Sequence, residues 1–441
     1  NSQNVGTGIG YTVGITFTGA DANNYAVSGG AVYVAGGNGS NGPANGVITQ
    51  LNSVTYTGPS GGNWSNPANW TTTGTTAVGA VPTQSSFGPS GGTPNVANVI
   101  IPVGKNVIYD AAVGTSVTSN LTDNGNVSFN LPSAETIAMP ISGTGSVTIS
   151  GLGRITLTGN NSYAGQTIIN AGTSLIAGSN TAIGAGNIQS NNGSFGAANG
   201  VVMNTINVSG PLTLLSDITT TGNQTYGNVK LDSTTNLVAQ GGNISLLGTV
   251  DGSVDKTQSL VVNAGTGVVT LGDSIGSIAR LGSINITGGS IYILADILTA
   301  TSQQYNGNIF IGDASYLNKT AVTGFLLNTY RPYFEYQRGS LTSTIDYKNT
   351  NPIYIRTMIS EDPSVFFNGA VNDVTTNTHT LLVAAISPSE ASATSNPPTI
   401  QFSQPVGAIQ PLYSLNSQTA INQAVVPASS QNQYVGSITI T

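Results

Sequence analysis

The 441-residue chain has no cysteine, one histidine (His379) and few charged residues, since Asp, Glu, Lys and Arg together make up only 6% of it. The absence of cysteine excludes disulfide frameworks and thiol catalysis, and it excludes zinc sites of the Cys and His kind. Ordinary soluble domains are roughly 25% charged. The polarity of this chain comes instead from Asn, Thr, Ser and Gly, a composition typical of secreted bacterial β proteins.

Positive charge is scarce as well, with ten Lys and Arg residues, a net charge of −7 and a pI near 4.4. Thinly spread cations give no electrostatic footprint for nucleic acid or an anionic membrane, so we expect neither as a partner. No apolar run approaches the roughly 20 residues that span a bilayer, and no signal peptide begins the chain. If the protein is exported, we expect this sequence to be a processed or excised piece.

Helix signals are nearly missing too. The best candidate, residues 387–394, is flanked by prolines and is predicted to be a loop. Short alternating apolar runs, cut by Gly, Asn or Asp, occur at 146–159, 260–276 and 281–294. This pattern indicates β-strands almost throughout, and the 38% apolar content with low net charge predicts a folded chain.

One motif, Gln and Tyr followed by Gly and an alternating run, occurs three times. It stands as QTYGNVKL at 224–231, SQQYNGNIFI at 302–311 and NQYVGSITI at 432–440, so that Tyr226, Tyr305 and Tyr434 mark equivalent positions. Residues 275–285 also align without gaps to 406–416, which places Gly276 and Gly407 in register. The sequence therefore contains a long internal repeat, whose second copy carries an insertion at 313–362.

Repeats of this kind stack because no single unit can bury its own apolar face. With several short strands per copy, the economical arrangement is a coil in which successive turns pair side by side at roughly 4.8 Å. We therefore predict an all-β, right-handed parallel β-helix, with inward Ile, Val and Leu columns and ladders of Asn, Thr and Ser at the corners. The repeated Gln and Tyr are expected to recur at one corner as structural positions; the alternative is a row that contacts a ligand.

The repeat unit resembles the body of filamentous-haemagglutinin-like exoproteins of the two-partner secretion pathway, which are large surface or matrix adhesins of Gram-negative bacteria. The resemblance rests on the Gln-x-Tyr-x-Gly unit, the stretch SLVVNAGTG and the 275–285 pattern, and it covers roughly residues 141–441. It implies an extracellular or cell-surface location, a role in attachment, aggregation or biofilm, and an outer-membrane transporter as partner during export.

Two further stretches agree with this resemblance. Residues 155–175 are similar to the autotransporter-associated β-strand repeat, with Tyr163, Gly165 and Gly172 at its marked positions. Residues 10–27 resemble the last strands of a small YDG-type domain, whose signature stands at 19–25. Both ends of the chain are expected to cut through a longer polymer, unless a neighbouring molecule supplies the missing strands.

The predicted organisation has five parts. They are the partial YDG-type β domain (1–50), a Trp-containing junction with the first rungs (51–140), β-helix repeats (141–312), a charged and aromatic insertion (313–362) and continuing repeats (363–441).

The only tryptophans, Trp64 and Trp70, stand in GGNWSNPANW at 61–70. An exposed indole offers a flat apolar face to a sugar ring, which makes both residues candidate glycan contacts. The alternative, which we favour, is that the rings cover the end of the β-helix or lock its junction with the small domain.

The insertion is the most charged part of the chain, and it contains the cluster TYRPYFEYQRG at 329–339. Loops that project from a rigid scaffold often carry binding sites, and Tyr and Arg are frequent at recognition hot spots. Tyr330, Arg331, Tyr333, Tyr336 and Arg338 are therefore candidate contacts for a glycan or protein. The alternative, which we favour here too, is a flap packed flat on the coil.

Many parallel β-helices degrade polysaccharides, and such sites need clustered carboxylates or a base with calcium. Asp251, Asp255 and Asp273 are the densest acidic set in the repeats, but no histidine stands near them in the sequence. They are interpreted as solvated turn carboxylates, and no catalytic residue, metal or cofactor is predicted.

The sequence thus predicts a non-enzymatic structural segment of a secreted filamentous adhesin or extracellular matrix fibre. Its expected partners are surface glycans, matrix polysaccharide or copies of itself. The first alternative is a self-assembling filament subunit joined by end-to-end strand exchange. The second is a β-helix polysaccharide lyase or hydrolase.

Overall fold

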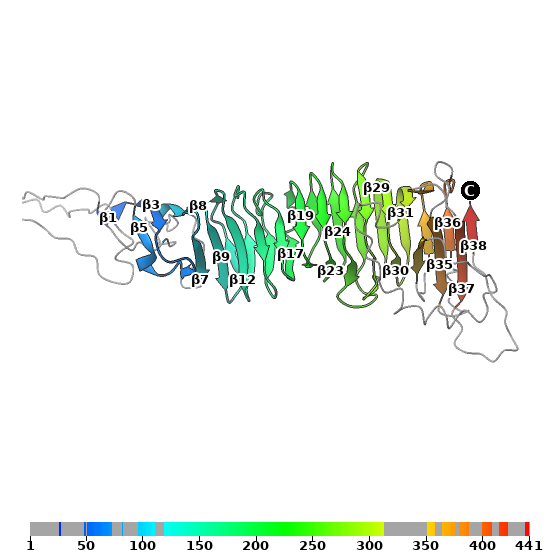
Figure 1. Ribbon diagram of the computed structural model, residues 1–441, viewed down its shortest axis with the longest axis horizontal. Coiled ribbons are helices and arrows are strands. Elements are labelled where there is room, and N and C mark those ends of the chain that lie inside the picture. Colours follow the sequence, from blue (N-terminus) through cyan, green and yellow to red (C-terminus); the bar gives the residue numbers. More distant parts are fainter. Residues whose placement is uncertain are drawn as a thin grey trace, which may run out of the picture. The chain divides into compact units, whose positions relative to one another are not determined.

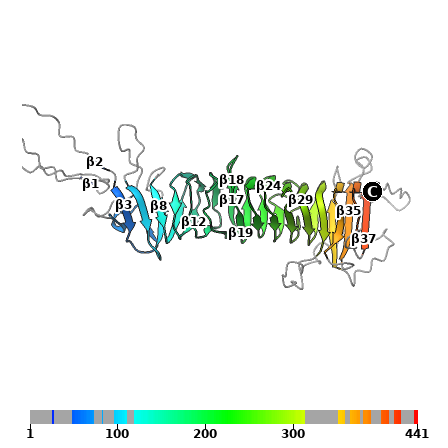
Figure 2. The same ribbon diagram turned by 90° about the horizontal axis from the view of Figure 1, so that it is seen from above.

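The structure is a computed structural model that describes residues 26–27, 48–49, 51–72, 82, 96–110, 119–312, 351–357, 364–374, 379–387, 399–407, 414–421 and 437–440. Over these residues it is a parallel β-solenoid, as predicted, and its one helical element is the 3-10 turn Pro67–Asn69. None of the described helices is long and apolar enough to cross a membrane. The chain divides into two compact units, residues 1–187 and 188–441, in each of which parallel strands stack in successive turns (Figures 1 and 2).

Unit 1 builds each turn from three strands that belong to three sheets. The first sheet contains, in spatial order, β5 (Trp70–Thr72), β3 (Leu51–Tyr56), β6 (Val96–Ile101), β8 (Asn120–Asp123) and β11 (Ile141–Ser142). The second contains β4 (Gly62–Asn63), β7 (Asn106–Asp110), β9 (Asn126–Leu131), β12 (Ser146–Gly151) and β14 (Thr167–Ile169). The third contains β10 (Glu135–Ile137), β13 (Arg154–Leu157) and β15 (Ser174–Ala177).

The turns of unit 1 repeat every twenty residues, since Val127 pairs with Val147 and Val147 with Thr167. Alternate residues therefore align into inward columns, which are apolar and buried. One strand breaks the pattern, because β5 runs antiparallel to β3 and covers its outer edge. A separate antiparallel pair joins β1 (Ala26–Val27) to β2 (Ile48–Thr49).

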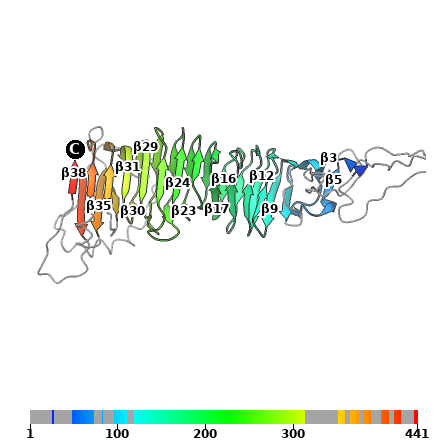
Figure 3. The ribbon, with the colours of Figure 1, turned by 180° about the vertical axis from the view of Figure 1, so that it is seen from behind.

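Unit 2 also has three strand positions per turn, here called faces A, B and C. Face A contains β16 (Ile188–Ser190), β19 (Ile206–Ser209), β22 (Gln224–Tyr226), β25 (Ile244–Leu246), β28 (Val268–Leu271), the second halves of β29 (Ile284–Ile293) and β31 (Gln303–Ile311), and β34 (Val371–Asp373). Figure 3 shows the same stacking from behind.

Face B contains β17 (Gly193–Ala197), β20 (Leu212–Leu214), β23 (Val229–Leu231), β26 (Val250–Gly252), the single bridge residue Ile275, β30 (Ile297–Thr299), β32 (Asn351–Thr357), β35 (His379–Ser387) and β37 (Ser414–Ile421). Face C contains β18 (Val202–Met203), β21 (Ile218–Thr220), β24 (Thr235–Ala239), β27 (Leu260–Asn263), the first halves of β29 and β31, β33 (Ser364–Phe367), β36 (Thr399–Phe402) and β38 (Ser437–Ile440).

Strands β29 and β31 run from face C to face A through a sharp bend that requires glycine. Gly307 has a φ of +147°, and a Cβ built on it would lie 1.8 Å from the carbonyl oxygen of Gly288 on the preceding turn. No residue with a side chain fits this approach, so the glycine allows two turns to stay in contact around the corner.

The repeated Gln and Tyr form a closed polar cluster inside the coil. Gln224 and Tyr226 have no exposed surface, and Tyr226 Oη donates a hydrogen bond to Gln224 Oε1 at 2.9 Å. The amide of Gln224 donates to Thr220 Oγ1 at 3.1 Å and to the carbonyl of Val238 at 2.8 Å. Thr220 Oγ1 in turn donates to the carbonyl of Gly222 at 2.7 Å. Burial of these polar groups is thereby compensated within one corner.

The second copy reproduces the cluster. Tyr305 Oη donates to Gln303 Oε1 at 2.8 Å, Gln303 Nε2 donates to Thr299 Oγ1 at 3.1 Å, and Thr299 Oγ1 donates to the carbonyl of Thr301 at 3.0 Å. The full motif is therefore Thr-x-x-x-Gln-x-Tyr. Its threonine was not part of the motif identified from the sequence.

The prediction that these residues recur at one corner is wrong. Tyr226 lies on face A, in register with Leu246, whereas Tyr305 lies on face C, in register with Phe367. The second copy is therefore set back by one face relative to the first. Because the cluster closes its bonds within a single corner, any corner of the coil can hold it.

The glycines of the repeat show the same displacement. Gly276 follows Ile275 on face B, and Gly407 follows Val406, which bridges to Val371 on face A. Both have left-handed φ values, +73° and +69°, and each donates its N–H to the preceding turn at 2.7 Å. Gly276 and Gly407 thus share a backbone conformation and a bond to the preceding turn, while Tyr434 lies outside the described residues.

The insertion ends earlier than predicted. Strand β32, inside the predicted range 313–362, pairs with β30 and β35 as a regular strand of face B. The coil therefore resumes by residue 351.

Amide ladders on the outside of the coil confirm the predicted corner pattern. Asn306 Nδ2 donates to Asn285 Oδ1 at 2.9 Å and to Thr287 Oγ1 at 3.2 Å. Its Oδ1 accepts from Asn368 Nδ2 at 2.8 Å and from Gln304 Nε2 at 3.2 Å. Both donors and both lone pairs of this side chain are used, so Asn306 ties three successive turns together.

We expect Tyr226→Phe and Tyr305→Phe each to lower the free energy of unfolding by about 1–2 kcal/mol, because each leaves a buried glutamine oxygen without its donor. The two losses should be similar although the residues lie on different faces. Thr219→Val, on the outer row between Val202 and Val238, is the matched control and should stay within about 0.5 kcal/mol of wild type. Denaturant unfolding would measure all three, and no loss for either tyrosine would contradict the closed cluster.

Candidate functional site

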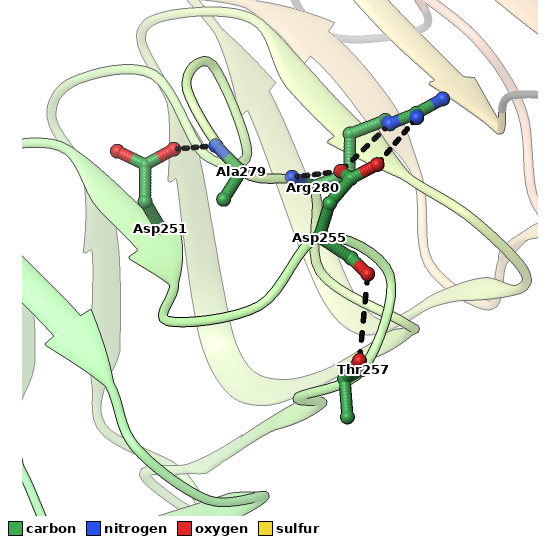
Figure 4. Close-up of polar contacts among 5 residues, drawn as sticks. All are labelled: Asp251, Asp255, Thr257, Ala279 and Arg280. Carbon is green, nitrogen blue, oxygen red and sulfur yellow. Dashed lines mark hydrogen bonds and ion pairs between the residues drawn. The ribbon is translucent and has the colours of Figure 1, made fainter.

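Two successive turns of unit 2 project loops at the corner between faces B and C. The first loop, residues 253–259, follows β26, and the second, residues 276–283, follows Ile275. Backbone hydrogen bonds join them, from Gly252 N to the carbonyl of Ala279 at 3.0 Å and from Lys256 N to the carbonyl of Arg280 at 2.8 Å. The two loops, here called the double loop, therefore form one bonded projection (Figure 4).

Asp255 and Arg280 hold the outer part of the double loop. Asp255 Oδ2 accepts from Arg280 Nη2 at 2.6 Å, and its Oδ1 accepts from Arg280 Nε at 3.0 Å and from the backbone N–H of Arg280 at 2.9 Å. The side chains are 44% and 23% exposed, respectively. The Arg280 side chain lowers the pKa of Asp255, so this carboxylate stays ionised and paired.

Asp251 anchors the inner part of the double loop. Its Oδ1 accepts from the backbone N–H groups of Ile278 at 2.7 Å and Ala279 at 3.1 Å, and the residue is 7% exposed. Burial raises the pKa of Asp251, and the backbone hydrogen bonds offset part of that rise. The structure thus brings Asp251 and Asp255 together, as the sequence suggested, but engages both in holding the second loop. Asp251 is not the solvated carboxylate that was predicted.

The third predicted carboxylate, Asp273, accepts from the backbone N–H of Ser274 at 2.7 Å. Across the described ranges, no group of three or more His, Asp or Glu side chains is placed to hold a metal ion.

The double loop presents apolar groups to solvent. Val254 is 58% exposed and Ile278 is 80% exposed, which is unusual among the large hydrophobic residues of the described part of the chain. Lys256 is exposed beside them, with a left-handed φ of +67° that its N–H bond to Arg280 helps to hold. Such a rigid apolar and cationic projection suits contact with a partner. Sequence reasoning missed it, although the longer turns at this point were a usable signal.

The tryptophan prediction is corrected by burial. Trp64 and Trp70 have no exposed surface, so neither ring presents a face to a sugar. Their ring centroids lie 4.9 Å apart, and Trp64 continues to Tyr109 at 5.1 Å. Trp64 Nε1 donates to the carbonyl of Pro82 at 2.9 Å, and Trp70 Nε1 donates to that of Trp64 at 2.7 Å. The rings belong to the core at the first turns of unit 1, where Trp70 is the first residue of the covering strand β5.

A stacked aromatic pair on the outside of face A was also missed. Tyr292 and Phe310 are in register on β29 and β31, with ring centroids 5.0 Å apart and planes 18° apart, and both are half-buried. The signal was present in IYIL and IFIG, which place an aromatic residue at the same outward position of successive turns.

The remaining candidate contacts, Tyr330, Arg331, Tyr333, Tyr336 and Arg338, lie outside the described residues. They stay predictions.

We expect Asp251→Ala to lower the free energy of unfolding by about 2 kcal/mol, because two backbone donors lose their acceptor. Asp255→Ala should cost less than about 1 kcal/mol, since the ion pair is partly exposed. Denaturant unfolding gives both values, and amide exchange in 276–283 should rise more for Asp251→Ala. A larger loss for Asp255→Ala would contradict the assignment of Asp251 as the main anchor.

Comparison with protein-family models gives no match for this chain, and comparisons with curated proteins and with solved structures give none either. The parallel β-solenoid and the double loop are therefore the observations from which function is argued.

Proposed function

We propose that the chain is a non-enzymatic structural segment of a secreted filamentous adhesin or matrix fibre at the bacterial surface. The observation that carries this proposal is the way in which each turn bonds to the next. Parallel backbone pairing and the amide ladder around Asn306 join neighbouring turns, as does the bond from the Gln224 amide to the carbonyl of Val238, while the rest of the Gln and Tyr clusters satisfies buried polar groups within a turn. A coil held in this manner suits a task that depends on length and stiffness.

The mechanism follows from the same geometry. Each added turn extends a parallel coil by about 4.8 Å, and each turn interacts chiefly with its two neighbours. Length can therefore grow without any change in the packing of the turns already present. The repeated Gln and Tyr bring their own hydrogen-bond partners, so that their burial leaves no unpaired group that would favour local opening and proteolysis.

The polar residues that could suggest catalysis support the structural interpretation instead. Asp251 accepts hydrogen bonds from two backbone N–H groups, and both carboxylate oxygens of Asp255 accept hydrogen bonds from the Arg280 side chain. A general base must keep an oxygen available to substrate. Both oxygens of Asp255 are hydrogen-bonded to Arg280, and Asp251 is only 7% exposed.

We expect the native secreted material to appear in electron microscopy as thin single rods, with an intact mass well above the 44.5 kDa of this sequence. Long regular filaments built from subunits of 44.5 kDa would contradict the proposal and favour the strand-exchange alternative. Release of unsaturated sugars from acidic polysaccharides would favour the lyase alternative.

Two candidate contact surfaces can be separated by substitution. Replacing Tyr330, Arg331, Tyr333 and Arg338 with alanine should reduce binding to surface glycans or cells at least tenfold, without lowering the Tm. The matched variant Val254→Ser with Ile278→Ser removes the apolar part of the double loop. Binding measured on immobilised glycans and whole cells decides between them, and loss only in the second variant would move the site to the double loop.

A further inference from the structure

One ionisable side chain of unit 1 points into the coil rather than out of it. Asp123 is the last residue of β8, in register with the inward Ile101 of β6, and it has no exposed surface. Its neighbours in the first sheet are otherwise the apolar residues expected of an inward column. A carboxyl group at this place is costly to bury in its charged form.

The hydrogen bonds given to this carboxyl are few. Asp123 Oδ1 accepts from the backbone N–H of Gly125 at 3.0 Å, and the backbone N–H of Val127 also favours the charged carboxylate, while Oδ2 finds no partner at hydrogen-bond distance in the described part of the chain. The next turn makes room for the group with glycine, because a Cβ on Gly145 would lie 2.6 Å from Asp123 Oδ1. The corner is thus shaped around a carboxyl group without giving it the partners that a buried carboxylate needs.

The surrounding elements bring no cation to the site. The ammonium of Lys105, on the preceding turn, donates to the carbonyl of Gly58 at 2.7 Å. Tyr163 is the titratable group that responds to Asp123, since its pKa is raised by burial and further by the charge of Asp123. Tyr163 Oη is itself bonded to Thr167 Oγ1 at 2.6 Å. The strands β6, β9 and β11, which pack around Asp123, contain no titratable side chain.

We propose that Asp123 makes unit 1 an acid-stabilised coil, in which the carboxyl is protonated in the folded state and the turns around it loosen as the pH rises from acid towards neutrality. A protonated carboxyl fills the pocket as a neutral group, whereas a carboxylate would need solvent, and solvent can enter only if the turns part.

The direction of the effect follows from proton linkage. Burial raises the pKa of Asp123 from 3.8 to about 7, so the folded state keeps its proton where the unfolded chain has lost it. The stabilisation is fully present below the unfolded value, declines as the pH rises from about 4 to about 7, and then levels off. The equilibrium constant for opening should rise by up to about a thousandfold over this window.

Amide hydrogen exchange on the full chain tests the proposal. In the wild type, protection of residues 119–151 relative to residues 218–246 should fall at least tenfold between pH 5 and pH 8. The comparison within one molecule cancels the intrinsic pH dependence of exchange. Asp123→Asn, which mimics the protonated carboxyl, should keep this ratio constant. The control Asp217→Asn removes an exposed carboxylate of unit 2 that accepts from Asn236, and it should behave as the wild type does in 119–151.

A ratio that does not change with pH in the wild type would overturn the proposal, and this measurement needs no variant to fold. An unaltered pH dependence in Asp123→Asn would overturn it as well, because the titrating group would then lie elsewhere.

Discussion

The inward side chains of the described turns are shielded from solvent, and this constraint governs the described structure. An inward side chain is therefore stable where it is apolar or finds its hydrogen-bond partners on its own turn or the next one, and Asp123, with its unpaired Oδ2, is an exception among the described residues. Most inward positions meet the requirement with Ile, Val and Leu. Gln224 and Gln303 meet it with a threonine and a tyrosine supplied from the same corner. The strands next to these two clusters can then pair continuously, because the buried glutamines have partners.

The second copy of the Gln and Tyr cluster lies one face earlier in the turn than the first copy and still forms the same hydrogen bonds. This is possible because each cluster forms them among neighbouring residues. If Gln224 depended on residues several turns away, its copy would work only after a whole number of turns. Since the cluster closes within one corner, the copy at Gln303 needs only a corner of similar shape. In the structure, strands and corners repeat with every turn. The repeat in the sequence is longer and does not correspond to a whole number of turns.

Sequence reasoning predicted the fold well and the site poorly. The alternation, the glycine corners and the repeat were enough for a parallel β-solenoid, and Gly276 and Gly407, aligned in the sequence, share a left-handed φ. The burial of individual side chains was harder to predict. Trp64 and Trp70 stand among Gly, Asn and Pro, which usually mark exposed loops, yet both rings are fully buried. The double loop was missed because its order comes from backbone bonds between turns, such as that from Lys256 N to the carbonyl of Arg280. Such bonds leave no pattern in a linear sequence.

The three carboxylates, Asp123, Asp251 and Asp255, show how position in the coil decides chemistry. Asp255 lies on the outside of the coil, where the Arg280 side chain lowers its pKa. Asp251 lies at the surface of the corner, where two backbone N–H groups replace part of its hydration. Asp123 lies inside the coil, its Oδ2 has no partner among the described residues, and burial raises its pKa to about 7. Asp123 is buried more completely than Asp251 and receives fewer backbone donors, and both differences raise its pKa further. In a coil with so few charged residues, a carboxyl group can therefore become pH-sensitive at one turn because it lacks the hydrogen-bond donors that other carboxylates have.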